Sequence, residues 1–444
     1  MTQLDSFGTV VFEGKENMED IVLKSPSWKD LASIFPGLQT IANLEKDNKL
    51  ELRYYQTIAC TTALLSNFRG VVRSATGSGK TLITAGICGM MLPRKSLILI
   101  HGSQLVRQTH EALCSYLTAD KVGLLNSATT EPKEVTVASI DYLHYYLQAQ
   151  MPNSSKEKTK ERKETWLNKK EYLQKYLATV DMLVIDECHH SSSDMFQDLG
   201  KWSNAYYRIG LSGTPLKKDL LSDMKLMSLV GPVIFDLNSK WLQEKGYLAQ
   251  AKLRIKTLDF TSPNSRMYDY ARARKNILVE NNSRIVSIAT DIVEALKDKN
   301  NRILVLTGNS VDLAIKLGEE VAALSRRSKG RPTHLVVTGK TSAKKTNSSF
   351  EQLRTGRVKC VITTKLADEG IDVPDVNNLM LVGGSKAYVS TVQRIGRGLR
   401  KKENEQELLV TDYFTLGNKY LEKHDKLRLK IYEEENFFTE IERA

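Results

Sequence analysis

A short glycine-rich segment, ATGSGKT (75–81), lies between an apolar run and a longer amphipathic one. Its two glycines let successive backbone N–H groups turn inward around phosphate oxygens, and the N-terminus of a following helix adds a favourable dipole. Lys80 would then reach the terminal phosphates of a nucleotide, and the Thr81 hydroxyl would bind Mg²⁺. The strict pattern has glycine where this chain has Ser74. The residues expected to bind the nucleotide here are Thr76, Gly77, Ser78, Gly79, Lys80 and Thr81.

Two adjacent carboxylates, Asp186 and Glu187, end the apolar run VDMLVI (180–185). In α/β folds nucleotide sites form at the carboxyl ends of parallel strands. Hydrolysis of ATP needs one group to hold the divalent metal and another to activate the attacking water. We assign Asp186 to Mg²⁺ and Glu187 to the water. For the pair taken alone, a solvated acidic turn is the alternative, and the phosphate loop upstream makes it the weaker one.

A basic segment near the end of the chain, QRIGRGLR (393–400), can complete a hydrolytic site. Arg397 and Arg400 are three residues apart, so on a helix they share a face. Such arginines place positive charge on phosphoryl oxygens as negative charge develops, an effect worth about a thousandfold or more. We predict that Gln393, Arg397 and Arg400 act on the nucleotide from a second domain. The alternative is a basic, solvated helix end.

Short β-rich runs alternate with amphipathic helical stretches from residue 52 onward, a pattern typical of parallel, doubly wound sheets. The first series of predicted strands comprises 70–74, 96–102, 135–139, 180–186 and 206–212. The second comprises 302–308, 333–339, 358–364 and 377–384. The sequence therefore predicts two similar α/β domains in tandem.

The length of 444 residues, of which 41% are apolar, is enough for two hydrophobic cores with appendages. We expect a small N-terminal accessory region (1–45), a first domain (46–240) with a charged insertion (153–176), a connecting segment (241–284), a second domain (285–420) and a C-terminal helical tail (421–444).

The formal net charge of +12 favours a polyanionic partner. The five cysteines are scattered, with neither a CxxC pair nor a metal-ligand spacing, which favours a reducing cytoplasm over a disulfide or zinc framework. No apolar run approaches the length of a membrane span, and the N-terminus lacks the layout of a signal peptide. We expect no contact with a membrane and a cytoplasmic location, in the host cytoplasm if a phage encodes the protein.

The phosphate loop and the sequence DECH (186–189) resemble motifs I and II of superfamily 2 helicases of the DExH type. Further segments resemble the remaining motifs, in the family's order: LRYYQ (52–56), HGSQLVRQ (101–108), SGTP (212–215), LVLTGN (304–309), TTKLADEGIDVP (363–374) and QRIGRGLR (393–400). The resemblance covers about residues 50 to 415. It implies two RecA-like domains that hydrolyse ATP with Mg²⁺ in the cleft between them.

Several roles rest on this resemblance alone. Arg53 and Gln56 would contact the nucleotide, with Gln56 pairing with the adenine base. Gly370 and Asp372 would belong to a loop that couples the nucleotide site to the bound strand. His189 resembles the residue that links the nucleotide to SGTP, and a satisfied core histidine is the equal alternative. The residues that would contact the nucleic-acid backbone are Ser103, Gln104, Arg107 and Thr364.

The charged insertion contains eight lysines and arginines against four glutamates. Basic side chains such as Lys169 and Lys170 can neutralise phosphates, and Trp166 can stack on an opened base. We therefore expect the insertion to contact DNA. A solvated charged helix whose tryptophan packs against the domain is an equally favoured alternative.

The forms LRYYQ, DECH and SGTP look more like those of DNA translocases and branch-migrating helicases, particularly the phage UvsW-like recombination helicases, than those of RNA-remodelling relatives. The resemblance implies an ATP-dependent DNA helicase or translocase that unwinds or branch-migrates forked and junction DNA in replication, recombination or repair. An RNA helicase of the DExH type is the alternative enzyme. A nucleic-acid-binding scaffold without ATP turnover is the alternative outside the enzymes, and the intact Lys80, Asp186 and Glu187 argue against it.

Overall fold

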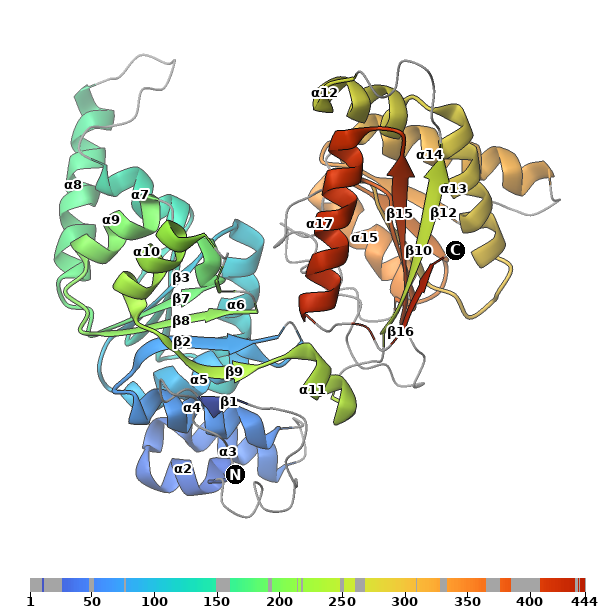
Figure 1. Ribbon diagram of the computed structural model, residues 1–444. Coiled ribbons are helices and arrows are strands. Elements are labelled where there is room, and N and C mark those ends of the chain that lie inside the picture. Colours follow the sequence, from blue (N-terminus) through green and yellow to red (C-terminus); the bar gives the residue numbers. More distant parts are fainter. Residues whose placement is uncertain are drawn as a thin grey trace. The chain divides into compact units, whose positions relative to one another are not determined.

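The computed structural model divides the chain into two compact units, Met1–Asn238 and Ser239–Ala444 (Figure 1). The structure describes residues 10–11, 26–47, 52–75, 77–148, 160–190, 194–213, 215–216, 219–247, 251–259, 268–308, 310–327, 334–364, 376–384, 408–435, 438 and 440–443.

The first unit is built on one sheet, whose described strands run in the order β1-β9-β2-β8-β7-β3-β6-β4-β5. All neighbouring strands are parallel except β4 and β5, which are antiparallel. The strands are β1 (Val10–Val11), β2 (Arg69–Ser74), β3 (Ser96–Ile100), β4 (Val122–Leu125), β5 (Thr130–Glu131), β6 (Val135–Ser139), β7 (Met182–Asp186), β8 (Tyr207–Ser212) and β9 (Val233–Leu237).

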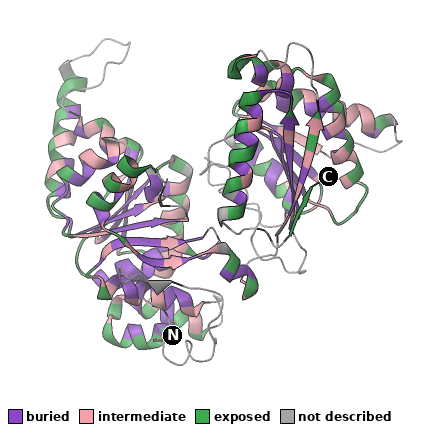
Figure 2. Ribbon diagram, viewed as in Figure 1, coloured by how far each residue is buried: buried purple, intermediate pink, exposed green. Residues whose placement is uncertain are grey.

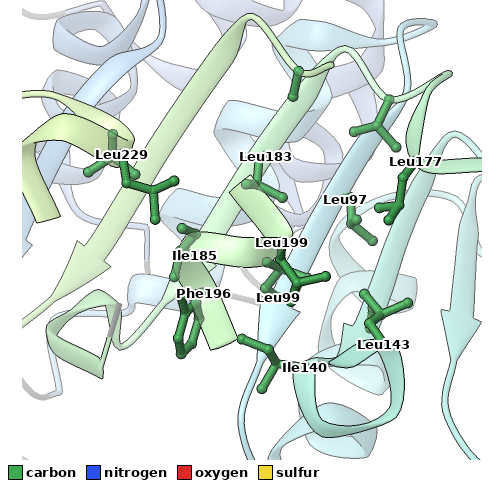
Figure 3. Packing of buried hydrophobic residues seen from close by; sticks show 14 of the residues in the cluster. Leu97, Leu99, Ile140, Leu143, Leu177, Leu183, Ile185, Phe196, Leu199 and Leu229 are labelled. Carbon is green, nitrogen blue, oxygen red and sulfur yellow. The ribbon is translucent and has the colours of Figure 1, made fainter. Parts of the chain in front are cut away.

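Helices cover both faces of this sheet (Figure 1). They are α2 (Trp28–Ile34), η1 (Pro36–Leu38), α3 (Gln39–Lys46), α4 (Tyr54–Leu65), α5 (Lys80–Met91), α6 (Ser103–Tyr116), α7 (Ile140–Leu147), α8 (Lys160–Leu177), η2 (Cys188–His190), α9 (Asp194–Trp202) and α10 (Leu220–Val230). Helices α7, α8, α9 and α10 share one core with β2, β3 and β7, part of which Figure 3 shows. The helices α4 and α5 lie on the opposite face (Figure 1). Because both faces are covered, β3 and β6 are buried along their whole length (Figure 2).

The N-terminal helices α2, η1 and α3 pack against α5, the helix that follows the phosphate loop, through glycine contacts. A Cβ added at Gly86 of α5 would lie 2.8 Å from the Trp28 ring, and one added at Gly37 would lie 2.3 Å from the Gly89 carbonyl oxygen. Trp28 and Leu38 are fully buried there. The residues 26–47 are therefore packed into the first unit, against the helix that carries Lys80.

Replacing Gly37 with alanine is expected to destabilise the first unit by about 1–3 kcal/mol, because the added methyl group meets backbone and η1 must move away from α5. Thermal unfolding followed by circular dichroism measures the loss. Gly339→Ala is the matched control, since nothing lies within 4 Å of a Cβ there. Equal unfolding temperatures for the two variants would show that the glycine contact does not hold the N-terminal helices in place.

The second unit is built on a second sheet, whose described strands are all parallel and run in the order β12-β13-β11-β14-β15-β10-β16. The strands are β10 (Ala251–Asp259), β11 (Ile303–Leu306), β12 (His334–Val337), β13 (Cys360–Thr363), β14 (Asn378–Leu381), β15 (Leu408–Leu416) and β16 (Glu440–Arg443). The helices are α11 (Ser239–Glu244), α12 (Tyr270–Ala273), η4 (Arg274–Val279), α13 (Asn282–Ala295), α14 (Val311–Arg327), α15 (Ala343–Arg354) and α17 (Lys419–Glu435).

Side chains of α15 and α17 share one core with this sheet, and those of α13 and α14 share a second core on its other face. Both units are thus doubly wound α/β domains with parallel sheets, as the sequence predicts. The predicted runs of both series form strands, and helices follow them where the amphipathic stretches lie.

Two segments differ from the expected organisation. The segment 241–284 contains β10, which pairs with β15 and β16 and so belongs to the second sheet. The C-terminal stretch is helical in α17 but ends in the strand β16. Glu440 and Glu442 of β16 pair with Lys252 and Arg254 of β10 at 3.3 and 2.8 Å, so charged side chains that suggest a helix by composition line neighbouring strands instead.

Candidate nucleotide site

The glycine-rich loop leaves the carboxyl end of β2 and enters α5 at Lys80. Gly77 and Gly79 have φ of 86° and 85°, a left-handed conformation that residues with a Cβ rarely adopt. The Ser74 and Ser78 hydroxyls lie 2.6 Å apart and hydrogen-bond across the loop. Serine at the position where the strict pattern has glycine thus closes the loop at its base.

Lys80 links the loop to the carboxylates of the next motif. Its Nζ donates to the Ser74 carbonyl oxygen at 3.4 Å and lies 3.6 Å from Oε1 of Glu187. A lysine ammonium group forms charge-assisted hydrogen bonds with phosphate oxygens. The lysine is therefore positioned for the contact that the motif predicts.

Asp186 is the last residue of β7, and the next residue, Glu187, has a φ of 49°. A left-handed conformation at a residue with a Cβ costs about 1–2 kcal/mol and is found where function fixes the backbone. The Glu187 N–H donates to Oδ1 of Asp186 at 3.0 Å. Burial, and then the neighbouring Glu187 carboxylate, raise the pKa of Asp186 to about 6, although Lys80 and the Glu187 N–H act to lower it. A nearby cation stabilises the charged form of such a carboxylate, as expected for a metal ligand.

Glu187 is held by two further side chains. Its Oε2 lies 3.3 Å from Nδ1 of His189 and accepts a hydrogen bond from the Ser212 hydroxyl at 3.4 Å. His189 is 2% exposed, and its Nδ1 lies 2.9 Å from the Ser212 oxygen. Ser212 ends β8 and begins SGTP. His189 therefore contacts both Glu187 and that segment, and its link to the nucleotide stays a prediction.

Gln56 and its neighbours contact the glycine-rich loop directly. The Tyr55 hydroxyl and the Gln56 Nε2 donate to the Ser78 carbonyl oxygen at 2.9 and 3.0 Å, and Arg53 donates to that of Gly77 at 3.4 Å. The Gln56 Oε1 accepts from the Arg53 N–H at 2.9 Å. Both ends of the amide are thus bonded to protein, and pairing with a base would require them to exchange partners. Tyr55 was not among the predicted site residues, although the motif LRYYQ contains it.

These residues fit a nucleotide with its metal. The glycines with positive φ shape the turn expected around phosphates, and the helix N-terminus and Lys80 supply positive charge. Asp186 is a buried carboxylate with a raised pKa, so a bound cation would stabilise its charged form. Thr81, the second residue of α5, is half-buried beside Lys80. The described part of the site can hold a triphosphate and present Glu187 to water.

The predicted nucleic-acid contacts of the first unit begin at α6, which follows the carboxyl end of β3 and so lies at the same edge of the sheet as the loop. Ser103 and Arg107 are exposed on α6. The side chain of Gln104 is outside the described residues. In the second unit Thr364 is 6% exposed, and its hydroxyl accepts the Gly339 N–H at 3.2 Å.

The charged insertion is not a projecting arm where the structure describes it. Its helix α8 packs against α7, and Trp166 is 4% exposed with its Nε1 donating to the Tyr145 carbonyl oxygen at 3.3 Å. Lys169 and Lys170 donate to Thr130 and to the Gln148 carbonyl oxygen, both at 2.6 Å. Trp166 therefore has no face open for stacking on a base. The alternative, a tryptophan that packs against the domain, holds.

Some predicted site residues lie outside the described part of the chain. They are Thr76, Gly370, Asp372, Gln393, Arg397 and Arg400. Their roles stay predictions from the sequence.

Two families match the chain. The family described as type III restriction enzyme, res subunit, matches residues 49–217, and the one described as helicase conserved C-terminal domain matches residues 284–402. The first match contains the phosphate loop and the carboxylates, and the second lies in the second unit.

Curated proteins and solved structures agree with these matches. Helicase 22 of Sulfolobus islandicus filamentous virus is 24% identical over 444 residues, covering 90% of this chain and 73% of that protein. The DNA 3′-5′ translocase XPB2 of Sulfurisphaera tokodaii is 26% identical over 388 residues, covering 82% and 81%. A solved structure of Dbp5 of S. cerevisiae bound to RNA has a TM-score of 0.60 at 14% identity, covering 94% and 95%. At that identity it shows the fold alone.

The fold, the phosphate loop and the matched families together define an ATP-dependent helicase, an enzyme that couples ATP hydrolysis to the unwinding of nucleic acid. Within that class, the chain has two tandem RecA-like α/β domains. None of the helices described for this chain has the length and hydropathy that a membrane span requires.

Proposed function

We propose that this chain is a DNA helicase or translocase that moves in the 3′-5′ direction. XPB2 of Sulfurisphaera tokodaii is named a DNA 3′-5′ translocase, and XPB of Kineococcus radiotolerans, 26% identical over 404 residues, is named a DNA 3′-5′ helicase. The net charge of +12 suits a polyanionic substrate. The observation that carries the motor assignment is the chain of contacts from Lys80 through Glu187 and His189 to Ser212.

In this proposal the residues of the nucleotide site in the first unit have distinct roles. Lys80 and the loop N–H groups hold the phosphates of ATP, and Thr81 and Asp186 hold Mg²⁺, which neutralises phosphate charge when bound. Glu187 accepts a proton from the attacking water, since its carboxylate is held but not fully buried. Arg53 and Gln56 fix the loop from the side of α4 and contact the nucleotide. When hydrolysis changes the position of Glu187, His189 transmits that movement to Ser212.

The roles of the second domain, and the contacts with nucleic acid in both units, are proposed from the motifs alone. Gln393, Arg397 and Arg400 would act on the transferring phosphoryl group, and Gly370 and Asp372 would couple the nucleotide to the bound strand. Ser103, Gln104, Arg107 and Thr364 would contact the strand's backbone, which carries no sequence information. We therefore expect little sequence preference.

The DExH subtype and the branched substrate are finer proposals. The sequence DECH (186–189) supports the subtype, and the resemblance to phage UvsW-like helicases supports forks and junctions in replication, recombination or repair. An RNA helicase of the same type is the competing assignment.

Strand separation on matched substrates tests the proposal. The wild-type protein with Mg²⁺ and ATP is compared on DNA duplexes with a 3′ or a 5′ tail, forked DNA, a four-way junction, blunt DNA and a tailed RNA duplex. We expect the 3′-tailed and forked DNA to be opened fastest, the junction to be converted, and the RNA duplex to remain paired. Opening of the RNA duplex alone would contradict the DNA assignment, and preference for the 5′ tail would contradict the polarity.

A further inference from the structure

Arginine, lysine and tyrosine side chains lie at the amino ends of three strands in the first unit, β2, β8 and β3, with β7 between β8 and β3 in the sheet. We call this set the amino-edge patch: Arg69, Arg94, Lys95, Tyr206 and Tyr207. The phosphate loop, Glu187 and Ser212 lie at the carboxyl ends of the same strands. Strands of five or six residues are about 17–20 Å long, so the length of the strands separates the patch from the nucleotide site.

The arginines of the patch lie over tyrosine rings. The Arg94 guanidinium is 5.5 Å from the centroid of the Tyr207 ring and donates to the Tyr207 hydroxyl at 2.7 Å. That of Arg69 is 5.9 Å from the centroid of Tyr206 and donates to the Tyr206 carbonyl oxygen at 2.9 Å. Both guanidinium groups are thus oriented, which lowers the entropy lost when they bind a further acceptor.

The described residues give these three cations no carboxylate within ion-pair distance. Within the described part of the chain, Arg69, Arg94 and Lys95 form no ion pair, whereas surface cations such as Lys121 and Arg354 do. Lys95 donates from Nζ to the Thr179 hydroxyl at 3.2 Å. Asp181, the carboxylate next to it, accepts the Lys95 backbone N–H at 2.9 Å. Among the described residues, Asp181 is thus the carboxylate at this edge, and it bonds the backbone of Lys95 and not its ammonium group.

The backbone holds the patch in this form. Asn67 and Phe68, which precede Arg69, have φ of 53° and 49°, so the turn into β2 is strained. The Asn67 side chain donates to the Tyr206 hydroxyl at 3.4 Å, and the Phe68 ring packs edge-on against Tyr207. Despite these contacts Tyr206 is 59% exposed. An ordered, exposed aromatic ring among unpaired cations is typical of a binding surface.

We propose that the amino-edge patch binds the phosphate backbone of a nucleic-acid strand, at a contact separate from the one expected at α6. Guanidinium groups match phosphate oxygens in geometry, and the tyrosine ring offers a flat face to a sugar or base. Contacts with phosphate oxygens and sugars carry no sequence information, so the contact would be independent of sequence. This inference rests on the proposed function in one respect, which is the choice of DNA and not RNA as the nucleic acid that is bound.

The test removes two charges and measures the salt dependence of binding. The variant carries Arg94→Gln and Lys95→Gln, and the control carries Lys297→Gln and Arg354→Gln, two cations that glutamates already neutralise. Fluorescence anisotropy gives the Kd for a DNA fork and an RNA duplex between 0.05 and 0.3 M salt, about the range in which phosphate contacts dominate.

Each phosphate contact contributes about 0.9 to the slope of log K against log salt, so we expect the double variant to lose about 1.8. At 0.1 M salt its affinity should fall by about tenfold or more. The control should match the wild type, and ATP hydrolysis without nucleic acid should be unchanged in both. If the double variant does not fold, Lys95→Gln alone should lose about 0.9, because its backbone contact to Asp181 remains.

Wild-type slope and affinity in the folded variant would overturn the patch assignment and leave an acidic protein segment as its partner. A wild type that binds only the RNA duplex would overturn the DNA assignment instead. The patch would still be tested on that RNA by the same difference in slope, so the two failures are distinguishable.

Discussion

Lys80→Ala is expected to reduce ATP hydrolysis to background, a loss of about a thousandfold, while the fold and nucleic-acid binding persist. The substitution removes the ammonium group that would hold the terminal phosphates. It also removes the cation 3.6 Å from Glu187, so that two adjacent carboxylates are left at the site without that counter-charge. Alanine is favourable in a helix, so α5 should still begin at this position.

Phosphate release from ATP measures the loss, and circular dichroism and fork binding without nucleotide check the fold. Lys121→Ala is the matched control, since Lys121 is a lysine of the same unit that pairs with Glu134, away from the loop. Hydrolysis near the wild-type rate in Lys80→Ala would contradict the assignment of the site.

Glu187→Gln is expected to separate nucleotide binding from hydrolysis. Turnover should fall by about 10²–10⁴, because glutamine cannot accept the proton of the attacking water. The affinity for Mg²⁺ and ATP should stay within about threefold, since a group that acts only in the transition state does not alter ground-state binding. The amide keeps an oxygen for the Ser212 hydroxyl, so the local structure should be retained.

Asp186→Asn provides the contrast, because a metal ligand lost from β7 should weaken binding of Mg²⁺ and ATP as well as turnover. Nucleotide binding is measured with a fluorescent ATP analogue, and hydrolysis by phosphate release. If the affinity of Glu187→Gln collapsed together with its turnover, Glu187 would be a structural or metal-binding residue and the division of roles would be wrong.

The fold could be predicted where burial on both faces produces continuous apolar runs. The strands β3, β6 and β7 have that pattern, and all three were predicted. The strand β10 was missed because it lies toward the edge of its sheet and carries charge on one face. Its alternation between partly exposed and buried side chains is visible in Lys252, Leu253, Arg254 and Ile255. The strand β16 was missed for the same reason, since its charged residues pair across strands.

The nucleotide site could be predicted because motif spacing fixes it. Strand, loop and helix must follow in that order for Lys80 to reach a phosphate, and parallel strands bring Glu187 and Ser212 to the same edge. The part played by Ser74 could not be predicted, because its contact with Ser78 depends on the exact path of the loop.

Surfaces were the hardest to predict. Trp166 lies in a basic run, yet α8 packs against α7 and buries its ring. The amino-edge patch draws Arg69, Arg94 and Tyr206 from three distant segments, which only the strand order brings together. Charge along a sequence does not show which cations find a carboxylate once the chain is folded.

The rate of ATP hydrolysis with and without forked DNA tests the central claim most directly. A motor that couples the chain Lys80, Glu187, His189 and Ser212 to a bound strand should hydrolyse ATP slowly alone and about tenfold or more faster when the strand closes the site. The same stimulation should be absent from Glu187→Gln. Hydrolysis that DNA and RNA both leave unchanged, or no hydrolysis at all by the wild-type protein, would contradict the account.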